Sequence, residues 1–346
     1  MAAWILARCA RRLPYGAAAV VSTSCALADE GPTFSVEKVD LKRVTHLQTL
    51  GFRSKGGANA KSFGYAKFIS EGARPDGRPL GRVRPTSVAV GVAGTAHGSA
   101  LVKVGRTTVM AAVKLEACQP DPERPDVGFI DVVMEFPPMC SASTRPGRPN
   151  DESSFIARRI EDALVDSRAV DLKKLSIKTG LWAWRVCLDI YCLDHDGSVL
   201  DAGLMAALAA LRDTKVPFVA VDDRGKLTYG GVGEKKKKDG DGDDGGGGAN
   251  ESSVEKGEEG TIEVAAAPVA VTTALYRKQL IVDPNAEEEG LADATVTCVL
   301  DQSGRLVGVH KPGGIAEASE TALMHCVAAC KLHYDARAKA IDTAFA

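Results

Sequence analysis

Three features that would narrow the function of this chain are missing from its sequence. None of the nine cysteines forms a C-x-x-C pair, so the spacing typical of structural zinc sites is absent. No apolar run reaches the ~20 residues of a transmembrane helix. The formal net charge is −2, so any nucleic-acid binding has to come from a local basic patch. The cysteines lie in apolar runs, which favours a reducing compartment where they pack as small hydrophobic side chains.

A strand followed by a helix dominates the middle of the chain. Apolar side chains alternate from Trp182 to Cys192, which predicts a half-buried strand. The pattern breaks at Asp194–Gly197, and the small apolar residues from Val199 to Leu211 then predict a buried helix pressed against a sheet. We expect this unit to carry the only carboxylate cluster able to hold a metal, made of Asp189, Asp194, Asp196 and Asp201.

Periodicity and turn residues predict the remaining elements. The expected strands are residues 86–92, 97–104 and 107–117 in an antiparallel meander, then 127–136, 216–221, 269–276, 279–282, 294–300 and 306–310. Helices are expected at 36–50, 65–70, about 153–167, and from about 318 to the end. Cys326 and Cys330 lie at helical spacing there, and we interpret them as packing residues rather than as metal ligands with His325.

Two stretches differ from the rest in composition. Residues 1–32 contain arginine but no acid before Asp29, which fits an organelle transit peptide, an unstructured extension or a start codon placed too far upstream. Residues 234–260 are rich in glycine and charge, and we expect a disordered insert there. The predicted organisation is an extension (1–60), a first domain (61–222), the insert (234–260) and a C-terminal domain (261–346).

Five motifs occur in the order found in ribonuclease PH-like proteins. They are Arg74–Arg78, Gly98–Gly105, Leu193–Gly197, Ile281–Pro284 followed by Glu287–Glu289, and His310–Gly314. Within that family the chain resembles ring subunits of the eukaryotic RNA exosome, over residues 61–233 and 261–339. The resemblance implies an α/β (α+β) ribonuclease PH-like fold. Its first domain is expected to be ribosomal-protein-S5-domain-2-like, and the smaller C-terminal domain is expected to be α/β.

The resemblance also implies partners and a compartment. Ribonuclease PH-like subunits pair into a heterohexameric ring that single-stranded RNA threads, with RNA-binding cap subunits attached. Such rings support 3′-to-5′ RNA degradation, including rRNA processing and mRNA turnover, in the nucleus, nucleolus and cytoplasm. A membrane and a cofactor are not expected.

The same resemblance indicates that the active site has been lost. Active members hold phosphate with an Arg and a Ser or Thr at a helix start, where this sequence has Asp151 and Glu152. A carboxylate and a phosphate ~4 Å apart repel each other by about 4 kcal/mol at an effective dielectric near 20. This lowers the affinity for phosphate by about three orders of magnitude. Asp189 and Asp196 remain as weak metal candidates, but Tyr191 stands where an acid is expected. We therefore predict a non-catalytic subunit. The alternatives are an active phosphate-dependent 3′-to-5′ exoribonuclease and an unrelated small-molecule-binding α/β protein.

Basic side chains of the first domain are the candidate RNA contacts, because in the family its loops line the RNA path. The candidates are Arg145, Arg148, Lys103, Arg106 and Lys114. Arg145 and Arg148 are preferred because proline and glycine flank them in a loop. The alternative for each one is an ordinary solvated side chain. Arg74 and Arg78 are interpreted either as further contacts or as ion-pair partners that fix their turn or a neighbouring subunit.

Overall fold

The computed structural model describes residues 68–69, 72, 74–141, 151–222, 225–229, 260–277, 279–314 and 318–345. All of them belong to the unit formed by residues 39–346. The extension, the helix predicted at 36–50 and most of the insert lie outside these ranges, as does nearly all of the helix predicted at 65–70. Among the described residues, no helix has the length and apolarity that crossing a bilayer requires.

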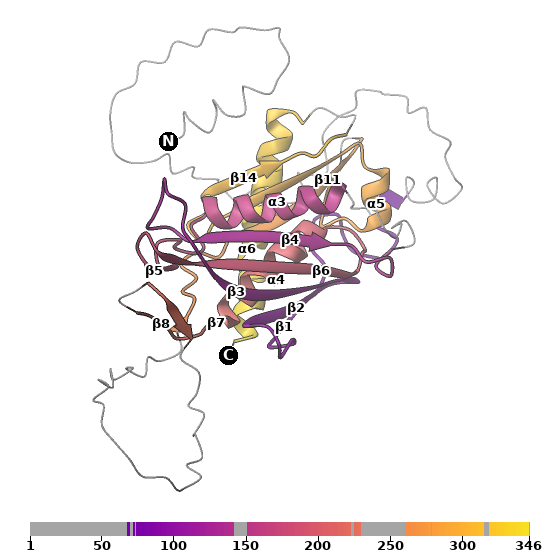
Figure 1. Ribbon diagram of the computed structural model, residues 1–346. Coiled ribbons are helices and arrows are strands. Elements are labelled where there is room, and N and C mark those ends of the chain that lie inside the picture. The colour runs from indigo at the N-terminus through magenta and orange to yellow at the C-terminus, as the bar shows by residue number, and fades with distance from the viewer. Residues whose placement is uncertain are drawn as a thin grey trace, which may run out of the picture. The chain divides into compact units, whose positions relative to one another are not determined.

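The first sheet is built around the long strand predicted from the alternating pattern (Figure 1). In spatial order it consists of β1 (Thr86–Val90), β2 (Gly98–Val104), β3 (Thr107–Cys118), β6 (Trp182–Asp194) and β4 (Phe129–Glu135), with β5 (Ser176–Lys178) also paired to β6. The pairs β1–β2, β2–β3 and β3–β6 are antiparallel, whereas β4 runs parallel to β6. The predicted meander is confirmed.

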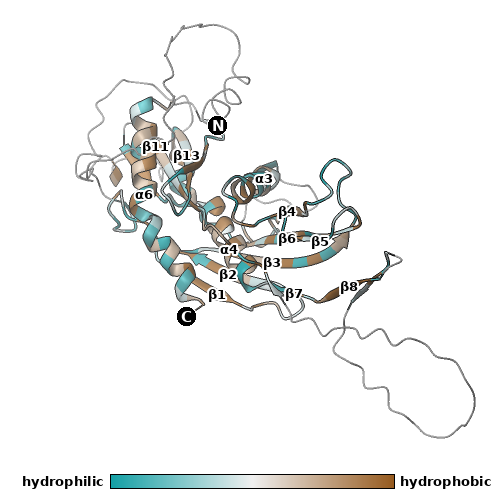
Figure 2. Cartoon of the chain, turned by 90° about the vertical axis from the view of Figure 1, so that its left-hand side faces the viewer, coloured by the Kyte–Doolittle hydropathy of each residue, from teal (hydrophilic) through white to brown (hydrophobic). Residues whose placement is uncertain are grey.

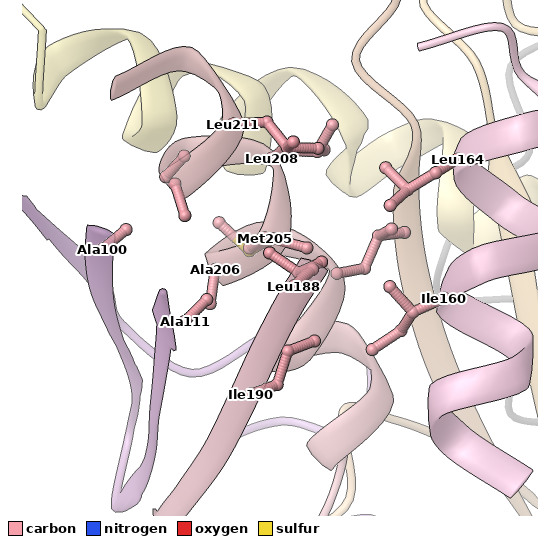
Figure 3. Close-up of a cluster of buried hydrophobic side chains, with 14 of the residues drawn as sticks. Ala100, Ala111, Ile160, Leu164, Leu188, Ile190, Met205, Ala206, Leu208 and Leu211 are labelled. Atoms are coloured by element: carbon pink, nitrogen blue, oxygen red, sulfur yellow. The ribbon is translucent and has the colours of Figure 1, made fainter. Parts of the chain in front are cut away.

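Helix α4 (Val199–Asp213) lies between the two larger of the sheets that the described residues form, in contact with β2, β3 and β11 (Figure 2). Every residue from Val199 to Leu211 is buried, as the unbroken small and apolar run predicted. Its leucines meet Leu188 and Ile190 of β6 in one cluster (Figure 3). Fully burying a leucine of this kind contributes roughly 1.5–3 kcal/mol.

Helix α3 (Asp151–Asp166) covers β4 and packs against α4 (Figure 1). Ile160 and Leu164 form its buried stripe and point into the cluster of Figure 3. A Cβ added at Gly203 of α4 would lie 3.0 Å from Ile160 Cδ1. The two helices therefore approach closely because α4 has no side chain at that point.

The second sheet is antiparallel and carries the C-terminal helix. Its order is β12 (Gln279–Val282), β11 (Val269–Tyr276), β13 (Ala294–Leu300) and β14 (Leu306–His310). Helix α6 (Glu320–Thr343) packs on β11 and β13, and the Ser319 hydroxyl accepts the Ala322 N–H at 3.2 Å as its N-cap. Cys326 and Cys330 are buried in this core, in agreement with the predicted packing role.

Short elements account for most differences from the predicted secondary structure. Residues 216–221 were expected to form one strand but form β7 (Lys215–Val216) and β8 (Val219–Val221), because Pro217 cannot donate a ladder hydrogen bond. The sequence patterns also missed α5 (Ala286–Leu291), β5, β9 (Leu227–Tyr229) and β10 (Gly260–Thr261). These elements are too short to show a hydrophobic period.

Candidate functional site

The two sheets are joined where the turn between β6 and α4 meets α5. Ser198 N–H donates to Glu289 Oε1 at 2.7 Å, and Ser198 Oγ donates to the Pro284 carbonyl at 3.0 Å. Ser198 is buried with φ 51°, a left-handed conformation that is costly for a residue with a side chain. A Cβ on Gly197 would lie 2.6 Å from the Asn285 carbonyl carbon. The turn is thus held tightly against the segment that precedes α5.

The start of α3 faces the same corner and carries the two predicted acids. Asp151 and Glu152 lie in the first helical turn and are both exposed, where the helix dipole favours negative charge. Glu152 Oε1 lies 4.0 Å from His195 Nε2, and the His195 ring packs edge-on against Phe136 with centroids 5.7 Å apart. We name the group Glu152, His195, Ser198 and Glu289 the acidic corner.

Glu289 is an acid of this corner that the sequence patterns did not single out. Burial raises the pKa of Glu289 to about 7; the Ser198 N–H opposes the rise, and the Asp201 and Glu152 charges add to it. Its carboxylate occupies the N-terminus of α4, the kind of position that binds anions in many proteins. The sequence signal was its place in the glutamate run Glu287–Glu289, which the family motif includes without giving Glu289 a role.

Behind the corner, a buried ion network surrounds Asp283. Arg84 donates to its carboxylate from the backbone N (2.6 Å), Nε (3.1 Å) and Nη2 (2.8 Å). Arg337 lies 3.7 Å from Asp283 Oδ1 and donates to Asp201 Oδ2 at 2.9 Å. Burial alone would raise the pKa of Asp283, but Arg337 and Arg84 outweigh it and hold the pKa well below its usual range. We name Arg84, Asp201, Asp283 and Arg337 the buried hub.

Arg74 is not available to RNA, contrary to one of the two interpretations. It is 2 % exposed, donates to the Leu80 carbonyl at 2.7 Å and to the Val282 carbonyl, and lies 3.6 Å from Glu288 Oε2. Arg78 donates from Nε to Asp76 Oδ2 at 2.6 Å. Both arginines therefore fix their turn against the second domain, which is the ion-pair alternative.

The expected carboxylate cluster does not form. Asp189 points from the outer face of β6 and pairs with Lys114 at 3.2 Å, whereas Asp201 lies in the buried hub. Asp196 Oδ2 is 3.9 Å from Arg84 Nη1. In the described part of the chain, no three His, Cys, Asp or Glu side chains are grouped so that they could bind a metal ion. The prediction of a cluster failed because alternation along β6 and the helical turn of α4 send these side chains in different directions.

A cavity of about 70 Å³ lies between α3 and β14, beside Arg159, Asp162 and His310. Burial lowers the pKa of His310 to about 4, and the Arg159 charge adds to the effect. Typical ligand pockets measure roughly 300–1,000 Å³. This cavity is too small for a nucleotide.

Residues 82–217 match the first domain of the 3′ exoribonuclease family, and residues 266–331 match its second domain. The chain belongs to the 3′ exoribonuclease family. The first matched stretch contains the first sheet with α3 and α4, and the second contains the second sheet and the first half of α6. The predicted ribonuclease PH-like, two-domain mixed α/β fold is thereby confirmed.

Relatives within the family include archaeal exosome proteins. The chain is 32% identical over 280 residues to the exosome complex component Rrp42 of Aeropyrum pernix, covering 80% of this chain and 93% of the relative. It is 37% identical over 243 residues to Rrp42 of Sulfurisphaera tokodaii, covering 70% and 79%. A chain of the Archaeoglobus fulgidus exosome with RNA bound to the active site matches with a TM-score of 0.67 and 31% identity, over 81% of this chain and 97% of that chain. Rice Rrp46, at 19% identity over 78% of this chain and 98% of that chain and a TM-score of 0.53, supports the fold alone.

The basic residues predicted from the family resemblance occupy different settings. Lys103 is exposed on the outer face of β2, and Arg106 is exposed in the turn between β2 and β3. Lys114 is exposed as well, but its ammonium group is paired with Asp189. Arg145 and Arg148 lie outside the described residues. An RNA contact by any of these five side chains stays a prediction.

Proposed function

We propose that this chain is a non-catalytic, RNA-guiding subunit of an exosome ring. The observation that carries the proposal is the acidic corner, where Glu152 and Glu289 place carboxylates at the starts of α3 and α4. A 3′ exoribonuclease that works by phosphorolysis needs inorganic phosphate, and carboxylates repel phosphate at close range. The relatives of this chain that are named Rrp42 are exosome components.

Exposed apolar residues at sheet edges support a need for partner subunits. Edge strand β14 exposes Leu306 (43%) and Val309 (40%), and edge strand β4 exposes Val133 (50%). Unpaired edges of this kind favour association with another chain. We therefore expect ring neighbours of ribonuclease PH-like fold, together with RNA-binding cap subunits.

Finer assignments extend this proposal. We propose that the chain is most similar to exosome complex component eight, and residues 310–314, which precede α6, support this choice. We expect such a subunit in the nucleus, nucleolus and cytoplasm, where it would support rRNA maturation and mRNA turnover. Imaging of the full-length tagged protein tests the compartment, and an organelle signal would favour the transit-peptide interpretation of residues 1–32.

The activity assay uses 3′-labelled single-stranded RNA, Mg²⁺ and inorganic phosphate. We expect no nucleoside diphosphate from the purified chain. Phosphate should bind more tightly to the double variant Asp151→Arg/Glu152→Ser, while Glu161→Ser, further along α3, should behave as the wild type. Phosphate-dependent release of nucleoside diphosphates by the wild type would favour the alternative, an active exoribonuclease.

Affinity capture followed by mass spectrometry tests the assembly. Recovery of other ribonuclease PH-like chains with the full-length protein is the expected result, whereas a stable homomeric ring would contradict it.

The basic candidates are tested by RNA binding to the captured complex, one variant at a time. Each lost phosphate contact should reduce the slope of the logarithm of the RNA association constant against the logarithm of the salt concentration by about 0.7 for single strands. Arg106→Ala should show this change, and Arg158→Ala, exposed on α3, serves as its control.

A further inference from the structure

The contact between α5 and the start of α4 is unusual in its charge. Glu289 reaches from the second domain to Ser198 of the first domain, and its carboxylate accepts the Ser198 N–H at 2.7 Å. The side chain is only partly exposed. The Ser198 N–H and the N-terminus of α4 favour the ionised carboxylate, whereas burial is the larger effect and favours the neutral form.

The backbone around this contact has little room to adjust. Gly197 has φ 77°, and a Cβ there would lie 2.7 Å from both the Ala286 N and the Pro284 carbonyl oxygen. Ser198 has φ 51° and is fixed by its hydroxyl bond to Pro284. The turn therefore cannot move away from α5 to relieve an unfavourable charge without breaking these contacts.

The charged groups that face Glu289 are mostly acidic. Glu152 faces it from the start of α3 and Asp201 from α4, while Arg84 faces it from the segment before β1. Arg84 is already committed to Asp283 and donates to the Asp196 and Gly197 carbonyls at 2.6 and 3.1 Å. His195 lies 4.0 Å from Glu152 and is a further titratable group of the acidic corner.

We propose that Glu289 is a proton-sensitive latch between the two domains. With its carboxyl group neutral, α5 stays docked on the first turn of α4; ionisation adds a negative charge near Glu152 and Asp201, which favours undocking of α5. The inference rests on this contact, the constrained turn and the surrounding charges, and it holds whether or not the chain guides RNA.

The direction of the pH dependence follows from linkage. Burial, reinforced by Asp201 and Glu152, raises the pKa of Glu289 from its ordinary 4.5 to about 7. The neutral form is thus preferred in the folded state, and the stability contributed by the latch is complete below about pH 4.5. It is lost as the pH rises toward about 7, within the range in which cells operate.

Urea unfolding of the full-length protein between pH 4.5 and 8.5 tests the latch. The Glu289→Gln variant keeps an oxygen that can accept the Ser198 N–H but cannot ionise. From pH 4.5 to 8, the ratio of the wild-type unfolding constant to that of Glu289→Gln should rise about ten- to hundred-fold, after allowance for partial exposure. Glu287→Gln, on the exposed side of α5, is the matched control and should give a constant ratio to wild type.

Hydrogen exchange gives the local readout. After correction for intrinsic pH dependence, amides of residues 286–291 should open more often in the wild type at pH 8 than at pH 5, but equally at both pH values in Glu289→Gln. A histidine side chain could give a similar pH dependence, so His195→Gln is the control. If Glu289 is the responsible group, the difference between pH 5 and pH 8 should persist in His195→Gln. The same pH dependence in wild type and Glu289→Gln would overturn the proposal. Direct titration of the Glu289 carboxyl carbon by NMR decides independently: a midpoint near 4.5 contradicts the latch, and one near 7 supports it.

Discussion

Two carboxylates six positions apart, Asp283 and Glu289, occupy the same junction and have opposite electrostatic settings. Asp283 is completely buried, yet Arg84 and Arg337 hold its pKa below the usual range. Glu289 is partly exposed, yet burial, reinforced by the Asp201 and Glu152 charges, raises its pKa to about 7. Burial therefore raises the pKa of both acids, and the supply of arginine decides whether that effect is outweighed.

This contrast divides the junction into a permanent part and an adjustable part. In the buried hub, Arg84 and Arg337 favour the ionised form of Asp283, and each removed partner would leave an uncompensated ion in a dry site. The acidic corner has one strained turn, one backbone donor and an excess of negative charge. We expect mutations in the hub to affect global stability, and mutations in the corner to affect the docking of α5.

Replacing Arg337 should break the contrast most severely. Arg337→Met keeps an unbranched apolar stem but leaves Asp201 and Asp283 without the guanidinium that lies 2.9 and 3.7 Å from them. Loss of one partner of a buried pair costs about 3–5 kcal/mol. Chemical unfolding should show a loss of this size. Lys339→Met, on an exposed position of the same helix, is the control, and equal stability of both variants would contradict the hub.

The sequence predicted the elements of this junction more completely than their contacts. Alternation over residues 182–192 and the apolar run after Val199 were sufficient to predict β6 and α4, because such periods report burial directly. Local patterns could not pair Arg84 with Asp283, which is 199 positions away, since an ion pair between distant segments leaves no periodic signal. Family resemblance correctly placed Asp151 and Glu152 at a helix start.

The close approach at Gly197 gives the second prediction. Gly197→Ala should destabilise the protein by about 2–4 kcal/mol, because the new Cβ meets backbone atoms at 2.6–2.7 Å and φ is 77°. Gly180→Ala separates the two causes: its φ is 78°, but nothing lies within 4 Å of the added Cβ. It should cost only about 1 kcal/mol. Similar losses in both variants would mean that the turn is not tightly packed against Asn285.

The hydroxyl of Ser198 gives the smallest effect and the sharpest separation within the corner. Ser198→Ala removes the 3.0 Å hydrogen bond to the Pro284 carbonyl but retains the backbone N–H that reaches Glu289. Urea unfolding should show a loss of about 1 kcal/mol, with the same pH dependence as the wild type. If the pH dependence disappeared with the hydroxyl, Glu289 would respond to the position of the whole turn and not to its local charges. The distinction between a permanent hub and an adjustable corner would then lie in packing rather than in the supply of arginine.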